Sequence, residues 1–165
     1  MIDLHGRTVI PGSSDSHAAV NHHLSPQFLA DLEQARTRYH DDWVSANLVQ
    51  FFADGGSGMI PPLTYEPAEY KKLVLELDKR GYQIMTHALR GDSAHMVLET
   101  YEQVANSNGR RDRRFRMEHA EIFPTADLSR FAKQSVIVST QPSFCCTDLT
   151  TIAASSLPFA GFAAS

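Results

Sequence analysis

The chain has 165 residues, 42% of them hydrophobic and 21% charged, which is a composition typical of one globular domain. Its net charge of -4 argues against general binding to nucleic acid or membrane, and no stretch approaches the roughly 20 apolar residues of a membrane span. The only two cysteines, Cys145 and Cys146, are adjacent and poorly placed to form a disulfide, so a soluble protein of the reducing cytoplasm is expected.

Strand-like and helix-like patterns alternate along the chain. A short strand is expected around Val9 and Ile10, and residues 25–43 form a polar connection whose Leu29, Leu32 and Ala35 predict a helix. Strands are then predicted at 47–53, 82–87, 115–119 and 135–140, and helices at 66–80, from Asp92 or Ser93 to about 109, and at 125–133. Alternation of this kind predicts βαβ units, and therefore an α/β fold with parallel strands.

A dense basic segment runs from Arg110 to Arg116. Such a segment could contact phosphates or an acidic substrate, but in an acidic chain a solvated loop is favoured.

Three of the eight histidines lie where predicted strands pass into loops: His17 after the segment from Val9 to Ser16, and His87 and His119 at the ends of their strands. In parallel α/β folds, ligands and metals bind where the strands end. A single histidine at such a place is most often structural. Three of them at one edge of a sheet favour a site for a divalent metal.

Several further motifs occur in a fixed order along the chain. They are Ile2 to Gly12 followed by Asp15-Ser16-His17, then Phe52-Ala53-Asp54-Gly55-Gly56, His87-Ala88 with Gly91-Asp92, Arg116-Met117-Glu118-His119-Ala120, and Gln141-Pro142. Together they resemble amidohydrolase family 3, which includes N-substituted formamide deformylases and relatives of exoenzyme regulatory proteins. The resemblance covers roughly residues 1–20 and 40–148.

This resemblance implies a (β/α) barrel of the TIM type that carries a metal-dependent hydrolase. In the family, one or two metals are held by histidines and commonly by a carboxylated lysine; the metal activates water, and an aspartate moves the proton. Carried over to this sequence, the metal ligands are His17, His87 and His119. The substrate is then a small amide-type molecule, and the cofactor is a divalent metal, expected to be zinc.

The sequence also departs from the family pattern. Ala19 stands where a second histidine of the first strand is expected, and Gln50 replaces the lysine. Without these two ligands, one metal ion at most is expected. The segment with the catalytic aspartate is not found, which leaves Asp54 as a substitute candidate and predicts slow hydrolysis or none.

The expected organisation is a partial barrel in residues 1–148, followed by a disordered tail at 149–165. Within the barrel, residues 1–24 form the first-strand segment, 25–46 a connection and 47–148 the later βα units. About five strands are too few to close a barrel that typically takes ~250 residues, and open sheet edges invite self-association. Two functions stay open: metal-dependent hydrolysis of non-peptide C–N bonds in amides or formamides, and an inactive remnant that at most binds a metal or a partner chain.

Overall fold

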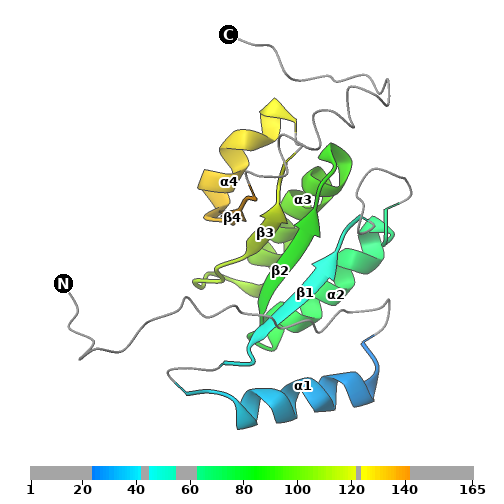
Figure 1. Ribbon diagram of the computed structural model, residues 1–165, viewed down its shortest axis with the longest axis vertical. Helices are drawn as coiled ribbons and strands as arrows, with labels where there is room; N and C mark the ends of the chain where they lie inside the picture. The colour runs from blue at the N-terminus through cyan, green and yellow to red at the C-terminus, as the bar shows by residue number, and fades with distance from the viewer. Residues whose placement is uncertain (1–23, 42–44, 55–62, 122–123, 142–165) are drawn as a thin grey trace, which may run out of the picture.

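The computed structural model describes residues 24–41, 45–54, 63–121 and 124–141, in which helices and strands alternate (Figure 1). The elements are α1 (Pro26–Arg38), β1 (Leu48–Phe52), α2 (Pro67–Lys79), β2 (Gln83–Ala88), α3 (Gly91–Asn108), β3 (Arg116–His119), the 3-10 turn η1 (Thr125–Asp127), α4 (Leu128–Gln134) and β4 (Ile137–Ser139). The strand expected around Val9 and the tail at 149–165 lie outside these residues.

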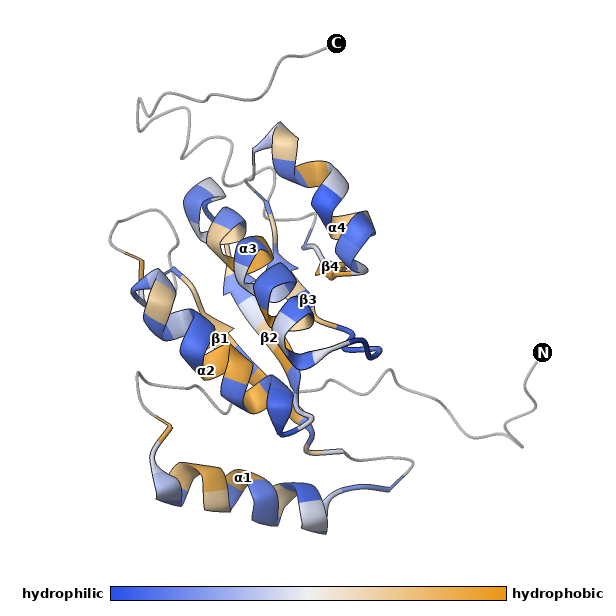
Figure 2. Ribbon diagram, turned by 180° about the vertical axis from the view of Figure 1, so that it is seen from behind, coloured by the Kyte–Doolittle hydropathy of each residue, from blue (hydrophilic) through white to orange (hydrophobic). Residues whose placement is uncertain are grey.

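The four strands form one parallel sheet in the order β1-β2-β3-β4, so each strand lies beside the next one along the chain. The helices α2 and α3 cover one face, behind the sheet in Figure 1 and in front of it in Figure 2. This arrangement confirms the predicted α/β class with parallel strands and is consistent with part of a (β/α) barrel. The proposed domain boundaries stay a prediction. No helix within the described ranges is both long and apolar enough to cross a membrane.

The core lies between the sheet and the helices α2 and α3. The strand residues that point toward these helices are apolar and buried, as the alternation of side chains along a strand requires. They are Val49, Phe51, Ile84, Ala88 and Met117. The one polar exception among them is Thr86, which is fully buried.

The hydroxyl of Thr86 is matched by two tyrosines from the covering helices. The phenol oxygen of Tyr70 lies 2.7 Å from Thr86 Oγ1, and that of Tyr101 lies 2.8 Å from it. Tyr101 also donates to the carbonyl of Arg116, at 2.9 Å. Because both phenols are buried, their pKa values are raised and they stay neutral donors.

Most element boundaries agree with the sequence predictions to within a few residues, but the start of α3 does not. The helix begins at Gly91 with Arg90 as its N-cap, rather than at Asp92 or Ser93. The hydroxyl of Ser93 donates to Asp54 Oδ2 at 2.5 Å and also lies 2.8 Å from the Arg90 carbonyl oxygen, so it does not accept a backbone N–H as a cap would. The strand β4 is also shorter than predicted, because α4 ends at Ser135 in a left-handed conformation.

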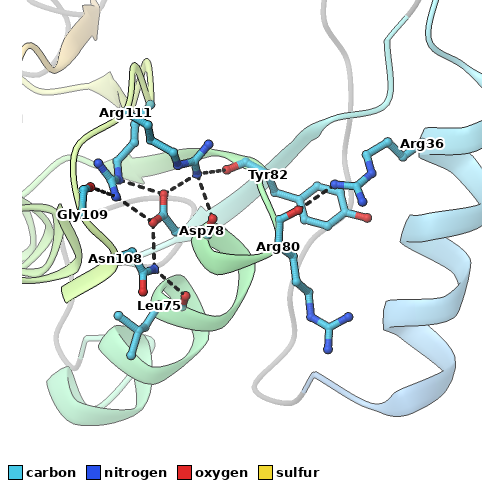
Figure 3. A network of polar contacts seen from close by, with 9 residues as sticks. Arg36, Leu75, Asp78, Arg80, Tyr82, Asn108, Gly109 and Arg111 are labelled. Carbon is cyan, nitrogen blue, oxygen red and sulfur yellow. Dashed lines mark hydrogen bonds and ion pairs between the residues drawn. The ribbon is translucent and has the colours of Figure 1, made fainter.

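The basic run from Arg110 to Arg116 is not simply a solvated loop, as its composition predicted. The carboxylate of Asp78, in the last turn of α2, is fully buried and accepts hydrogen bonds from Asn108, Arg111 and Arg113 (Figure 3). Of these, Arg113 is itself buried and contacts Asp78 with two nitrogens, at 3.0 and 3.2 Å. A buried arginine is tolerated because this carboxylate compensates its charge.

The helix α1 rests against the end of α2 and the start of β2. Arg36 donates to the Arg80 carbonyl at 2.8 Å, and its guanidinium lies 4.6 Å from the centre of the Tyr82 ring (Figure 3). Leu32 is buried on the same helix. The predicted helical connection is therefore confirmed, and its apolar side contacts the core as expected.

The first turn of α3 is tied to the segment before α4 by Asp127. Its carboxylate accepts from His95 at 2.7 Å and from Arg130 at 3.0 Å. The side chain of His95 is half-exposed and forms this contact at the surface. Burial opposes ionisation of Asp127, but the hydrogen bonds from His95 and Arg130 outweigh it and hold the pKa below its ordinary 3.8.

This shift predicts an acid-sensitive contribution to stability. Because the folded pKa is depressed, Asp127 stabilises the fold above its ordinary pKa, and that stabilisation is lost as the pH falls through the folded pKa. Asp127→Asn is therefore expected to lower the free energy of unfolding by about 1 kcal/mol at neutral pH and by less in acid. Urea unfolding at several pH values measures this, with Asp31→Asn on the exposed side of α1 as the control. A deficit that did not shrink in acid would contradict the expectation.

Candidate functional site

Three side chains meet at the edge of the sheet where the strands end. Asp54 follows β1, His87 lies near the end of β2, and His119 ends β3. The strand register places Phe52 beside His87, and Ala88 beside His119. Parallel neighbouring strands thus bring residues from three separate parts of the chain to one place.

The two imidazoles are in contact. The ring centroids of His87 and His119 lie 4.5 Å apart, with the rings in an edge-to-face orientation at 73°. Phe52 lies on another side of His87, with ring centroids 5.1 Å apart. His87 is buried with 6% exposure, so its ring is held by its neighbours rather than by solvent.

Asp54 joins the end of β1 to the start of α3. One carboxylate oxygen, Oδ2, accepts from the backbone N–H groups of Leu89 and Arg90, both at 2.8 Å, and from the Ser93 hydroxyl at 2.5 Å. The other oxygen, Oδ1, lies 3.4 Å from Nε2 of His87. The three donors to Oδ2 fix the carboxylate so that Oδ1 is directed toward His87.

Neither of these two facing atoms has a hydrogen-bond partner among the described residues, although both are buried. Buried polar atoms are nearly always paired, so an unpaired nitrogen and an unpaired oxygen in contact call for an explanation. Burial lowers the pKa of His87 below its ordinary 6.5, and the neighbouring His119 lowers it further, whereas Asp54 acts in the opposite direction. At neutral pH His87 is thus an uncharged imidazole, the form that binds metals.

His119 has an unusual backbone. Its φ is 69°, and the N–H of Ala120 donates to the carbonyl of Glu118 at 3.0 Å, which closes a γ-turn centred on His119. Ala120 is left-handed as well, with φ of 49°. Such conformations are costly for residues other than glycine and gather at functional sites. The turn redirects the chain just where the imidazole must face His87.

Acidic groups surround the two histidines. Glu121 lies 3.4 Å from Nδ1 of His119, and Glu118 pairs with Arg116 at 2.8 Å. Together with Asp54 they make the surroundings favourable for a cation. An uncharged, buried, unpaired imidazole nitrogen with a second imidazole beside it could supply part of the donor set of a divalent metal.

The structure therefore brings two of the three predicted metal ligands together. His17 and the degenerate position Ala19 lie outside the described residues, so their places are still predictions. Within the ranges that the structure describes, no group of three or more His, Cys, Asp or Glu side chains could hold a metal ion by itself. Gln50 is buried in β1, in register with Met85, two residues before His87 on the same face of the sheet.

The hydrogen bonds that hold Asp54 in place were not predicted from the sequence. Asp54 was predicted only as a substitute base, whereas its contacts also give it a structural role in linking β1 to α3. Ser93 could have been recognised from the sequence, because it is a small polar residue in the first turn of the helix that follows a strand carrying a histidine.

Comparisons with known proteins agree with this geometry. The amidohydrolase family model matches residues 20–157. A curated relative, the Arabidopsis thaliana protein LONG AFTER FAR-RED 3, is 31% identical over 140 residues, which cover 76% of this chain and 24% of that protein. This chain thus spans about a quarter of the length of the relative that it matches.

Two solved structures share the fold. An uncharacterized metal-dependent hydrolase from Pyrococcus furiosus matches with a TM-score of 0.60 and 20% identity, over 77% of this chain and 29% of its own. Another, from Pyrococcus horikoshii, matches with a TM-score of 0.60 and 18% identity, over 74% and 28%. The extent of the family match, with motifs in order along a parallel sheet, leads to one conclusion: this chain belongs to the amidohydrolase family.

Proposed function

We propose that this chain takes part in the metal-dependent hydrolysis of C–N bonds other than peptide bonds, in small amide-type substrates. The observation that carries the proposal is the buried, unpaired Nε2 of His87 beside His119 and Asp54. It lies at the edge of the sheet where barrel enzymes carry their active sites. The two cysteines in the sequence support a reducing compartment, and we propose a cytoplasmic location.

His87 and His119 would hold the metal, with His17 as the third ligand that the sequence predicts. Zinc suits imidazole ligands, and when bound it polarises a carbonyl and activates water. Glu121, next to Nδ1 of His119, orients that ring. One ion at most is expected, because Gln50 cannot be carboxylated and so cannot bridge two metals.

A second candidate function is metal binding without turnover. The observation that favours it is that each of the three described acids near the histidines is already held by at least one neighbouring group. Asp54 accepts three hydrogen bonds at one oxygen, Glu118 pairs with Arg116, and Glu121 contacts His119. Proton transfer to the leaving nitrogen contributes roughly 10²–10⁴-fold to the rate, and it needs an acid that can approach the substrate.

We expect zinc to bind in a ratio of at most one ion per chain, and His87→Gln to weaken that binding by roughly 100-fold or more. Isothermal titration calorimetry of the metal-free chain measures both values. His95→Gln, which changes a half-exposed histidine of α3, is the matched control and should bind zinc like the parent chain. Equal affinity in His87→Gln and the parent would refute the metal site.

Turnover separates the two candidate functions. With zinc bound, simple formamides and N-acyl amino acids are expected to be hydrolysed well below the ~1–10³ s⁻¹ that is usual for enzymes. Slow release of product that disappears in His87→Gln supports the hydrolase. Tight zinc binding with no release above the buffer rate supports the binding function instead.

A further inference from the structure

A second candidate site lies at the opposite end of the sheet from the histidines. There the loop between α3 and β3 borders a cavity of about 680 Å³, together with the last turns of α3 and α4. Arg114 comes two residues before the start of β3 and Ser135 two residues before β4, whereas His119 ends β3. In Figure 2 this loop is the strongly hydrophilic segment that leads into β3.

The lining of this cavity is strongly basic. Five cationic residues and two acidic ones line it, an excess of three positive charges in a chain whose net charge is -4. We call this cavity the basic groove. Its cations are Arg110, Arg111, Arg113, Arg114 and Lys133, and its acids are Glu102 and Asp112.

Two of the five cations stabilise the fold through contacts with a buried carboxylate, whereas the other three do not. Arg111 and Arg113 are committed to Asp78. Among the residues that the structure describes, Arg110 makes no hydrogen bond or ion pair. Arg114 pairs with Asp112 at 3.1 Å, where both side chains are more than two-thirds exposed.

Lys133 lies 3.9 Å from Glu102 and is 77% exposed. Exposed pairs such as those of Arg114 and Lys133 contribute little, so these two cations, and Arg110, are available to a ligand.

The groove is held in place before any ligand arrives. Gln83 donates to the Arg114 carbonyl at 2.6 Å, and Arg113 donates to the Gly109 carbonyl at 2.7 Å. Arg114 has a φ of 48°, a conformation that is costly for a residue with a side chain. The loop is therefore anchored at both ends, by a partly buried hydrogen bond at Gly109 and an exposed one at Arg114, which hold the backbone that carries the available cations.

The charges of the helix ends do not account for all of these cations. The carboxyl end of a helix carries about half a negative charge, which one nearby cation compensates. Here Lys133 already lies in the last turn of α4, and both Arg110 and Arg114 lie beyond the end of α3. The composition of this basic run is compatible with phosphate contacts, and the proposed metal site makes no use of it.

We propose that the basic groove binds a small anion with two or more negative charges, carried by phosphoryl or carboxylate groups. Guanidinium groups offer paired donors that match both kinds of oxygen acceptor, and the cavity has room for a molecule of that size. The proposal is independent of the proposed hydrolysis, because it concerns the other edge of the sheet and makes no use of the histidines.

The test is calorimetric titration of the whole chain with tripolyphosphate and, separately, with citrate, at constant ionic strength. The double variant Arg110→Ala/Arg114→Ala should bind at least about tenfold more weakly than the parent chain. Lys72→Ala/Lys79→Ala, which removes the same charge from exposed positions of α2, should bind as the parent does. Because Arg110 and Arg114 do not contact Asp78, unchanged thermal unfolding will show that the variant is folded.

Binding of tripolyphosphate alone would identify a phosphoryl ligand, and binding of citrate alone a carboxylate ligand; either supports the proposal. Two outcomes would overturn it. One is that neither anion binds more tightly than chloride at the same ionic strength. The other is that the α2 control loses as much affinity as the groove variant, because binding would then follow net charge rather than the site.

Discussion

Asp78→Asn is expected to destabilise the fold by about 3–5 kcal/mol. The carboxylate of Asp78 is completely buried and is the counter-charge for Arg113, whose side chain is 7% exposed. Removing it leaves a buried guanidinium without compensation. The amide also replaces one of the two carboxylate oxygens by an NH2 group, so at that position, where Arg113 and either Asn108 or Arg111 now donate, donors would face donors.

Urea unfolding of the parent and variant chains measures this effect. Asp112→Asn is the matched control, because Asp112 is 75% exposed in its pair with Arg114 and should change stability by less than about 0.5 kcal/mol. If Asp78→Asn unfolded at the same urea concentration as the control, the buried network would not hold the end of α2 to the loop before β3.

Asp54→Ala is expected to affect both stability and metal affinity. Three donors lose their acceptor at once, and at about 1–3 kcal/mol for a buried unpaired donor the total is roughly 3 kcal/mol, since Leu89 and Arg90 are only partly buried. His87 also loses the carboxylate that faces its Nε2. Loss of such a supporting group typically weakens metal binding by about 10–100-fold.

Asp54→Asn separates the two effects, because its carbonyl oxygen can still accept from Leu89, Arg90 and Ser93. This variant should recover most of the stability that Asp54→Ala loses, yet still bind zinc more weakly than the parent. Thermal unfolding and zinc titration measure the two effects. If the parent hydrolyses a formamide and Asp54→Asn abolishes that turnover without loss of zinc, Asp54 would be the base that the sequence suggested.

The sheet and the meeting of two histidines could be predicted from the sequence because both depend on local patterns. Apolar runs of the right length mark the strands, and parallel strands connected in sequence place their ends together. His87 and His119 lie at the ends of such runs, so their proximity follows from the topology.

The Asp78 network could not be predicted in the same way. Asp78 and Arg113 lie 35 residues apart, and nothing in either neighbourhood shows that both are buried. A run of arginines in an acidic chain predicts exposure, and the prediction was wrong for Arg113 because tertiary packing supplied a counter-charge. The γ-turn at His119 was equally hidden, since a positive φ is uncommon for every residue other than glycine, histidine included.

The exposed strand β4 affects how this chain associates in solution. It is the last strand of the described sheet, and Ile137 and Val138, which point to opposite faces, are 43% and 42% exposed. We propose that a second copy associates along this edge, as the open-edge argument from sequence suggested. Sedimentation equilibrium should then give an apparent mass that rises with concentration, and Val138→Lys should hold it at the monomer value of 18.3 kDa.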